Sequence, residues 1–428
     1  MVQDVKIRKP ISVTEAVQKV MNYRKRGEKE TIAFHDCDQR RLAEPVIAKH
    51  NVPSFDKSPY DGFALRSIDT KDASEDHPVH FEVVEHIGAG DLPTKTLKAG
   101  EATRIMTGAP IPEGADCVAM FEVCQTYNKA DKQFMSTTHT FEPGQNIIKE
   151  GSEVKKGTIL VEEGTVINPG VKAVLATFGY AQVQVAKKPR VGVIATGSEL
   201  LEIDEELKPG KIRDSNAYMI GSQVIRAGGE YTYYGKLADK FEPSYQKIKE
   251  ALEEVDILIT TGGVSVGDFD LMPAIYEKLG AEVLFNKVAM RPGSVTTVAT
   301  LGDKLLFGLS GNPSACYVGF ELFARPILQH YLFSKKPYMK CIKATLGEDF
   351  PKKNTFSRFV RSYITYEDGK VYVKLAGMDK SNVVTSLAHS TCLMVLPAGT
   401  SGYTKGSEVD ILLNDDDEGQ AFFNIKGE

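Results

Sequence analysis

The sequence lacks the cysteine and histidine patterns that would hold a structural metal or a disulfide framework. Its six cysteines are scattered over 428 residues without a C-x-x-C pair. No histidine stands beside them at the spacing of zinc ligands. We therefore expect reduced thiols, as in a cytoplasmic protein. The histidines are equally dispersed, and no Ser/His/Asp or Cys/His triad can be nominated from the sequence.

Long apolar runs and an excess of positive charge are also missing. No apolar stretch approaches the roughly 18 residues that a membrane span needs. The N-terminal residues alternate charged and apolar types, so we expect no secretory signal. The net charge of −5 argues against nucleic acid as the main partner. The sequence thus predicts a cytoplasmic protein that binds neither nucleic acid nor a membrane.

The order of the expected elements indicates several domains. From residue 189 strands and helices alternate, which predicts a doubly wound parallel sheet with right-handed crossovers. From Val79 to Tyr127 short apolar segments alternate with glycine and proline, which is typical of a small, mostly β module. After residue 335 the pattern is β alternation, with a hairpin turn at Asp368-Gly369. The predicted fold is multidomain α/β and β: a central doubly wound parallel α/β domain, an inserted small β module and a C-terminal β barrel.

The stretch from Phe141 to Val185 is rich in glycine and is expected to return and pack with residues 10–50. This return would make the β module an insertion. The predicted domains are a discontinuous linker domain of residues 1–50 plus 145–186, the inserted module of residues 51–144, the α/β domain of residues 187–334, and the barrel of residues 335–428.

The stretch from Asp256 to Asp270 joins an apolar, β-branched strand to a turn rich in glycine, hydroxyl and acid side chains. Gly262 and Gly263 allow a sharp turn or a close approach to a ligand. At the carboxyl end of a strand, such a loop offers N–H groups to an anion and carboxylates to a hard cation. Strand, turn and helix also follow one another in doubly wound domains without a ligand there. The carboxylates of Asp268 and Asp270 favour a site for phosphate and Mg²⁺.

Two other strand ends carry similar chemistry, at Thr196-Gly197-Ser198-Glu199 and at Ser310-Gly311-Asn312-Pro313. Open α/β sheets bind ligands at the carboxyl ends of their strands, so the three loops are expected to converge. Arg291, after a further strand, adds a fixed cation suited to phosphate or an oxyanion.

Six motifs, in this order along the chain, resemble those of the molybdopterin molybdenumtransferase family, which includes the E domain of gephyrin. They cover nearly the whole sequence, and Ser381 to Leu387 adds to the likeness. The motifs are Pro59-Tyr60-Asp61-Gly62, Met106-Thr107-Gly108-Ala109, Ala195 to Leu200, Thr261 to Asp268, Met290-Arg291-Pro292-Gly293 and Leu309 to Pro313. Without the resemblance, Pro59 to Gly62 is better explained as a good turn than as a functional motif.

The resemblance implies an elongated homodimer of four-domain subunits, with the linker domain in dimerisation and the α/β domain binding molybdopterin. It implies Mg²⁺-assisted insertion of molybdate into adenylylated molybdopterin, with release of AMP, and possible transient contact with a molybdopterin adenylyltransferase. The alternatives are molybdopterin adenylylation itself, or a gephyrin-like scaffold or binding protein without catalysis.

The resemblance also implies roles for individual residues. Asp61 and Thr107 match positions that matter for activity and are expected to reach the cleft of the partner subunit. The catalytic candidates are Asp61, Thr107, Glu199 and Asp270. The candidate metal ligands are Glu199, Asp268 and Asp270. The candidate substrate-binding residues are Thr196, Gly197, Ser198, Ser215, Gly262, Gly263, Ser265, Arg291, Ser310, Gly311, Asn312 and Pro313.

One motif departs from the family pattern. Where the family often has Lys-Pro-Gly-Lys, this chain has Arg291-Pro292-Gly293-Ser294, so one of two expected cations is missing. Arg358 or Arg361 could supply a replacement charge. On composition alone, each is expected to be an ordinary surface arginine.

Overall fold

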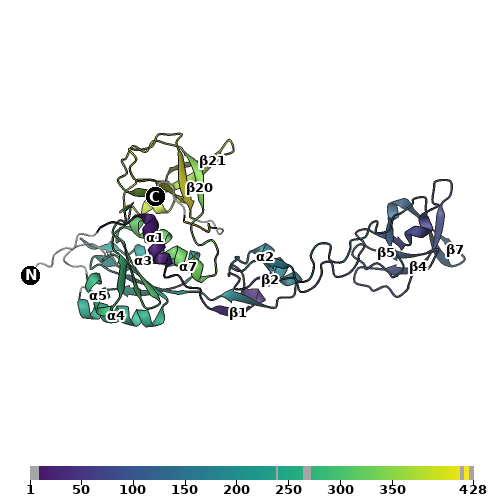
Figure 1. Cartoon of the computed structure of the whole chain (residues 1–428), viewed down its shortest axis with the longest axis horizontal. Helices are drawn as coiled ribbons and strands as arrows, with labels where there is room; N and C mark the ends of the chain where they lie inside the picture. Colours follow the sequence, from purple (N-terminus) through teal and green to yellow (C-terminus); the bar gives the residue numbers. More distant parts are fainter. Residues whose placement is uncertain (1–8, 238–239, 264–270, 415–418, 424–428) are drawn as a thin grey trace, which may run out of the picture. The chain divides into compact units, whose positions relative to one another are not determined.

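The computed structural model describes residues 9–237, 240–263, 271–414 and 419–423 (Figure 1). The chain divides into two compact units. The first holds Met1–Glu44, Glu163–Lys172 and Ala181–Glu428, and the second holds Pro45–Glu162 and Ala173–Tyr180. The finer division into four domains stays a prediction. No helix of the described residues is long and apolar enough to cross a membrane.

A six-stranded sheet with the order β14-β11-β15-β19-β18-β16 organises the first unit. Its strands are β11 (Arg190–Ala195), β14 (Glu230–Lys236), β15 (Ile257–Thr261), β16 (Glu282–Phe285), β18 (Thr297–Leu301) and β19 (Lys304–Leu309). The first four strands in this order run parallel. β18 runs antiparallel to both of its neighbours, because only Gly302 and Asp303 connect it to β19 and a parallel crossover needs far more chain. The doubly wound α/β fold is confirmed, with a mixed rather than wholly parallel sheet.

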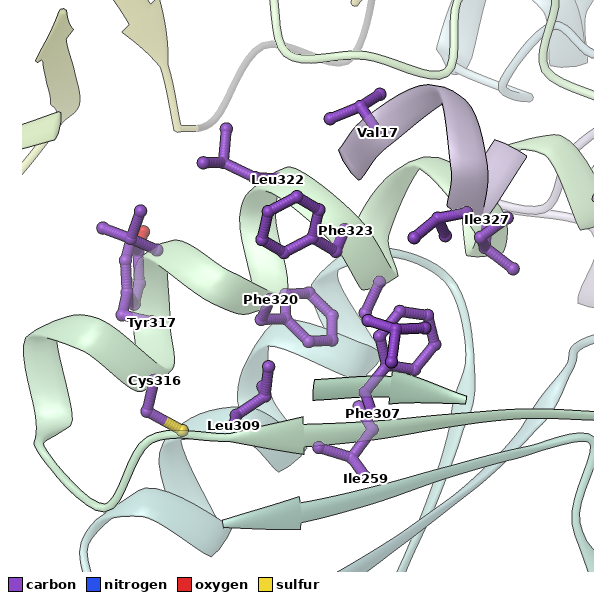
Figure 2. Packing of buried hydrophobic residues seen from close by; sticks show 14 of the residues in the cluster. Val17, Ile259, Phe307, Leu309, Cys316, Tyr317, Phe320, Leu322, Phe323 and Ile327 are labelled. Atoms are coloured by element: carbon purple, nitrogen blue, oxygen red, sulfur yellow. The ribbon is translucent and has the colours of Figure 1, made fainter. Parts of the chain in front are cut away.

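Helices cover both faces of this sheet. α4 (Phe241–Glu254) and α5 (Met272–Leu279) pack on one face. The other face is covered by α1 (Val13–Met21), α3 (Asn216–Arg226), α6 (Pro313–Gly319), the π-helical turn η4 (Phe320–Ala324) and α7 (Arg325–Tyr331). Figure 2 shows Phe320 above Leu309, with Phe307 of the same strand and Ile259 of the neighbouring strand β15 in the same cluster. This buried apolar layer fixes the helix that begins at Pro313 against the strand that ends at Leu309.

A closed barrel follows the α/β domain, as predicted. Its strands are β20 (Cys341–Leu346), β21 (Ser357–Glu367), β22 (Lys370–Leu375), β23 (Cys392–Leu396) and β24 (Glu408–Leu413). The pairing of β21 with β23 closes the circle. The short strand β17 (Met290–Arg291) leaves the α/β domain and pairs with β21, which sets Arg291 opposite Arg358. Backbone hydrogen bonds therefore join the barrel to a loop of the α/β domain.

The second unit is mostly β. Its main sheet has the order β6-β3-β5-β4-β8-β7. The strands are β3 (Gly62–Leu65), β4 (Val79–Ile87), β5 (Glu101–Ile105), β6 (Cys117–Met120), β7 (Cys124–Lys129) and β8 (Lys132–Thr137). In the same unit β2 (Val46–Ile47) pairs with β9 (Ile159–Val161). The small β module inferred from the sequence is thus present.

The remaining elements belong to the linking parts of the chain. In the first unit β1 (Lys29–Ala33) pairs with β10 (Gln182–Ala186), and β12 (Leu200–Leu201) pairs with β13 (Ile212–Arg213). Helix α2 (Pro169–Thr177) lies between β9 and β10 in the chain. The pairing of β1 with β10 shows that the chain after the module does return to the N-terminal segment.

Candidate active site

Three predicted strand ends meet at one edge of the α/β sheet. Strands β11, β15 and β19 are parallel neighbours, so their carboxyl ends lie side by side. The backbone N–H and the hydroxyl of Thr196 both donate to the carbonyl of Thr261, at 2.9 and 3.0 Å. The N–H of Gly262 donates to the carbonyl of Leu309 at 2.9 Å. The loops that leave these strands are therefore tied together by backbone hydrogen bonds.

The glycines at this edge stand where a side chain has no room. Gly262 has φ +85°, and a Cβ there would lie 2.6 Å from the carbonyl oxygen of Thr196. A Cβ on Gly263, at φ +62°, would lie 2.8 Å from the Thr196 hydroxyl oxygen. Such distances are far shorter than van der Waals contact. The double glycine is thus required by its positive φ, which fits the predicted sharp turn, and by the close approach of a second strand-end loop, which was not predicted.

Glu199 offers the one described carboxylate among the predicted metal ligands. Its side chain is exposed and folds over Gly197, where a Cβ would meet a carboxylate oxygen at 2.5 Å. The Lys211 ammonium binds the carbonyl of Ser198 at 2.6 Å and so holds this loop. Ser265, Asp268 and Asp270 lie outside the described residues. Among those described, no three His, Cys, Asp or Glu side chains gather as a metal site.

The start of α3 joins the same edge through a residue that the sequence interpretation did not select. Asn216 donates from Nδ2 to the carbonyl of Gly311 at 2.8 Å. Asp214 caps the helix by accepting from the Ala217 N–H at 3.1 Å. The predicted Ser215 lies between them and is exposed. In the sequence, Asp214-Ser215-Asn216 indicates the start of a helix. It does not indicate that Asn216 binds a residue at the end of another strand.

A pocket of about 480 Å³ lies between the α/β domain and the barrel. The α/β side contributes Arg291, Ser310 and Asn312, all three predicted from the sequence. The barrel side contributes Arg358 and the stretch from Asp379 to Asn382. The pocket therefore brings together candidate residues that are distant in the sequence.

The expectation that Arg358 and Arg361 are surface residues is wrong. Their exposed fractions are 8% and 2%. Arg358 pairs with Asp379 at 2.8 Å and donates to Asn354 at 2.7 Å. Buried charges are retained when such partners satisfy them. A single sequence could not show this, because Asp379, the partner that balances the charge, lies 21 residues further along the chain.

Arg361 has a different set of partners. It donates to the Ser386 hydroxyl at 2.8 Å and to the carbonyls of Met378 and Lys380 at 3.0 and 3.1 Å. Burial lowers the pKa of the Arg361 guanidinium. Arg361 thus holds both ends of the loop from Met378 to Ser386, whereas Arg358 lines the pocket.

The same loop is fastened to the start of α6. The Ser314 N–H donates to the carbonyl of Ser381 at 3.0 Å, and its hydroxyl donates to the carbonyl of Val383 at 2.7 Å. Ser314 is fully buried and follows Pro313, the first residue of the helix. The motif from Ser381 to Leu387 therefore lies against the Ser310–Pro313 turn that was predicted to bind substrate.

Asp61 and Thr107 form a pair within the second unit. The backbone N–H of Thr107 donates to Asp61 Oδ1 at 2.7 Å, and its hydroxyl donates to the same atom at 3.0 Å. These two bonds, the N–H first, hold the pKa of Asp61 below its ordinary value. The structure thus joins two predicted residues from separate motifs and keeps the carboxylate ionised.

Known families account for nearly all of the chain. Family models described as "MoeA N-terminal region (domain I and II)", "Probable molybdopterin binding domain" and "MoeA C-terminal region (domain IV)" match residues 11–179, 192–330 and 343–413. The molybdopterin molybdenumtransferase of Bacillus subtilis is 55% identical over 96% of each chain. That of Staphylococcus aureus strain COL is 48% identical over 96% of this chain and 98% of its own.

Solved structures agree with these matches. Two structures of the molybdopterin biosynthesis MoeA protein of Pyrococcus horikoshii superpose with TM-scores of 0.83 and 0.79. Both are 29% identical and cover 95% of this chain, with 99% and 100% of their own chains. The likeness therefore extends over the α/β domain, the barrel and the β module.

Proposed function

The chain belongs to the molybdopterin molybdenumtransferase (MoeA) family, and on that premise we propose that it inserts molybdate into adenylylated molybdopterin and releases AMP. The observation that carries the proposal is the pocket in which Ser310, Asn312 and Arg291 face the barrel loop. An anionic substrate and a small oxyanion both need cations and hydrogen-bond donors within one cavity. This pocket supplies both kinds of group.

The glycine edge is the proposed binding site for the substrate phosphates. Gly311 is exposed between Ser310 and Asn312 of the pocket, so backbone N–H groups of this turn can approach phosphate oxygens. Gly262 and Gly263 keep the neighbouring loop close to Thr196. Arg291 adds a planar cation at the same cavity. We propose that these groups orient the substrate, with its reacting oxygens toward the barrel loop.

Glu199 fits a magnesium role, because its exposed carboxylate has no hydrogen bond or ion pair within the described part of the chain. One or two carboxylates together with substrate phosphates commonly hold Mg²⁺. We propose Glu199 as one ligand, with Asp268 and Asp270 as further candidates. The cation would neutralise phosphate charge and stabilise AMP as a leaving group.

We further propose a cytoplasmic homodimer in which Asp61 and Thr107 serve the cleft of the partner subunit. The lowered pKa of Asp61 means that this carboxylate is ionised at neutral pH. It can therefore orient water or accept a proton, but it is not poised to act as a general acid. Transient contact with a molybdopterin adenylyltransferase, to receive the adenylylated substrate, belongs to the same proposal.

The products separate this function from its alternatives. Molybdate-dependent release of AMP from adenylylated molybdopterin supports insertion, whereas ATP consumption with release of pyrophosphate indicates adenylylation. Binding without either product indicates a scaffold. In the transferase, Glu199→Gln and Asp270→Asn should abolish magnesium-dependent AMP release while the dimer persists; full activity in both variants would exclude the metal assignment.

A further inference from the structure

The charges that line the pocket do not all remain available to a ligand. Three cations, Arg291, Arg358 and Lys380, and one carboxylate, Asp379, line it, which leaves an excess of two positive charges. Asp379 is 4% exposed and binds Arg358 at 2.8 Å. It also accepts from Lys352 at 3.0 Å. The guanidinium of Arg358 is therefore already committed to a protein partner.

Unlike Arg358, the side chains of Arg291 and Lys380 remain available to a ligand. Both are exposed, and neither makes a hydrogen bond or ion pair with the residues that the structure describes. They also come from different domains, Arg291 from β17 and Lys380 from the barrel loop. The excess positive charge of the pocket thus resides in two groups that a bound anion can recruit.

The backbone beneath Lys380 is held from two sides. Its carbonyl accepts from Arg361 at 3.1 Å, and its N–H donates to the carbonyl of Met378 at 3.0 Å. Ser314 binds the carbonyl of the next residue, Ser381, at 3.0 Å. A solvated surface lysine does not require such an anchored backbone. Here the anchoring fixes where the ammonium can reach, which lowers the ordering cost of binding.

We infer that Lys380 is a binding residue for the transferred oxyanion, acting together with Arg291. The inference deepens the proposed function and rests on it. Molybdate carries two negative charges, which the two uncommitted cations match. Ser294 in the same pocket is neutral, so it contributes a hydroxyl and no charge. Arg358 acts through Asp379, and is a positioning residue for the loop that carries Lys380.

Equilibrium dialysis against molybdate alone, with molybdenum measured on both sides, tests the inference directly. Lys380→Gln should weaken binding about tenfold or more, the loss expected when a charge-assisted hydrogen bond is removed. Lys380→Arg should stay within about threefold of the native protein, because it keeps the positive charge on an exposed side chain that makes no fixed contact in the described part of the chain. Lys353→Gln is the matched control, since it removes an exposed lysine of the barrel that does not line the pocket.

A relocated charge distinguishes electrostatic binding from a structural effect. Lys380→Gln combined with Ser294→Lys should recover most of the lost affinity, because both positions line one pocket. A structural defect would not be repaired in this way. Unchanged affinity in Lys380→Gln, or no binding of molybdate by the native protein, would overturn the inference.

Kinetics separate this inference from the proposed function. With adenylylated molybdopterin, Lys380→Gln should raise the molybdate concentration for half-maximal AMP release about tenfold and leave the saturated rate within about twofold. If the native protein binds molybdate through Lys380 but releases no AMP, the transferase proposal fails and the oxyanion site stands. If AMP is released with equal molybdate dependence in both proteins, the assignment of Lys380 fails alone.

Discussion

The two sides of the pocket are built by different physical means. The α/β edge is ordered by backbone: parallel strands, glycines at positive φ, and N–H groups that donate to neighbouring carbonyls. The barrel loop from Met378 to Ser386 is ordered by buried side chains, chiefly Arg361 and Ser314. The edge should therefore be intolerant of a single methyl group, whereas the loop should respond to the loss of one polar group.

The largest effect is expected at the glycine edge. Gly262→Ala combines a strained φ of +85° with a collision against the Thr196 carbonyl, so the strand-end loops must separate. We expect AMP release to fall on the order of 100-fold, since misplaced reacting groups are costly. Gly280→Ala is the control, because its φ of +71° is similar but nothing lies within 4 Å. It should cost about 1 kcal/mol of stability and leave the rate unchanged. Equal rate losses in both would contradict the steric explanation.

Arg361→Met tests the loop from Met378 to Ser386 by removing the guanidinium that donates hydrogen bonds to both of its ends. The carbonyls of Met378 and Lys380 would lose a buried partner, and we expect a loss of about 3 kcal/mol in the free energy of unfolding. Denaturant unfolding measures this loss, and hydrogen exchange at residues 378–386 reports whether the loop opens. Arg361→Lys keeps the charge but not the fork of donors, so it should recover only part of the stability. Full stability of Arg361→Met would show that the loop is held by other contacts.

A smaller effect is expected where the two sides touch. Ser314→Ala removes the hydroxyl that donates to the Val383 carbonyl at 2.7 Å and leaves that carbonyl unpaired. The free energy of unfolding should fall by about 1 to 2 kcal/mol. The affinity for molybdate should fall with it, because the loop carries Lys380. Ser407→Ala, in a partly exposed turn of the barrel, is the control and should change neither quantity. Stability lost without any change in affinity would separate the loop from the oxyanion site.

The smallest effect concerns Asp61, whose charge is stabilised without burial. Thr107→Val removes the hydroxyl donor and keeps the N–H, so the pKa of Asp61 should rise toward its ordinary value. The pKa of Asp61 is lower in the folded protein than in the unfolded chain, so the ionised carboxylate adds to the free energy of unfolding. This added stability is fully present above the ordinary pKa of Asp and is lost as the pH falls through the folded pKa. In Thr107→Val this loss should begin at a higher pH. Carboxyl ¹³C NMR titration of Asp61 measures the shift, and Thr107→Ser should show little of it.

The sequence was most informative where backbone sterics dictate the residue type. Gly262 and Gly263 were recognisable because positive φ and close approach both demand glycine. The doubly wound fold followed from the alternation of strands and helices. Arg358 and Arg361 could not be placed, because Asp379 and Ser386, which bind them, lie 21 and 25 residues further along the chain. Asn216 was missed for the same reason, since its partner Gly311 belongs to another strand end. The antiparallel direction of β18 was not predicted. It follows from the two-residue connection to β19, and the periodicity of apolar residues does not show the direction of a strand.

The central claim is that molybdate binds in the pocket between the α/β domain and the barrel. Anomalous diffraction at the molybdenum absorption edge, from crystals equilibrated with molybdate, tests this claim most directly. We expect an anomalous peak within contact distance of the Arg291 guanidinium and the Lys380 ammonium, beside the Ser310–Asn312 turn. The peak should weaken in crystals of Lys380→Gln. A well-occupied peak elsewhere on the molecule, with this pocket free of molybdenum, would contradict the assignment of the pocket as the site of insertion.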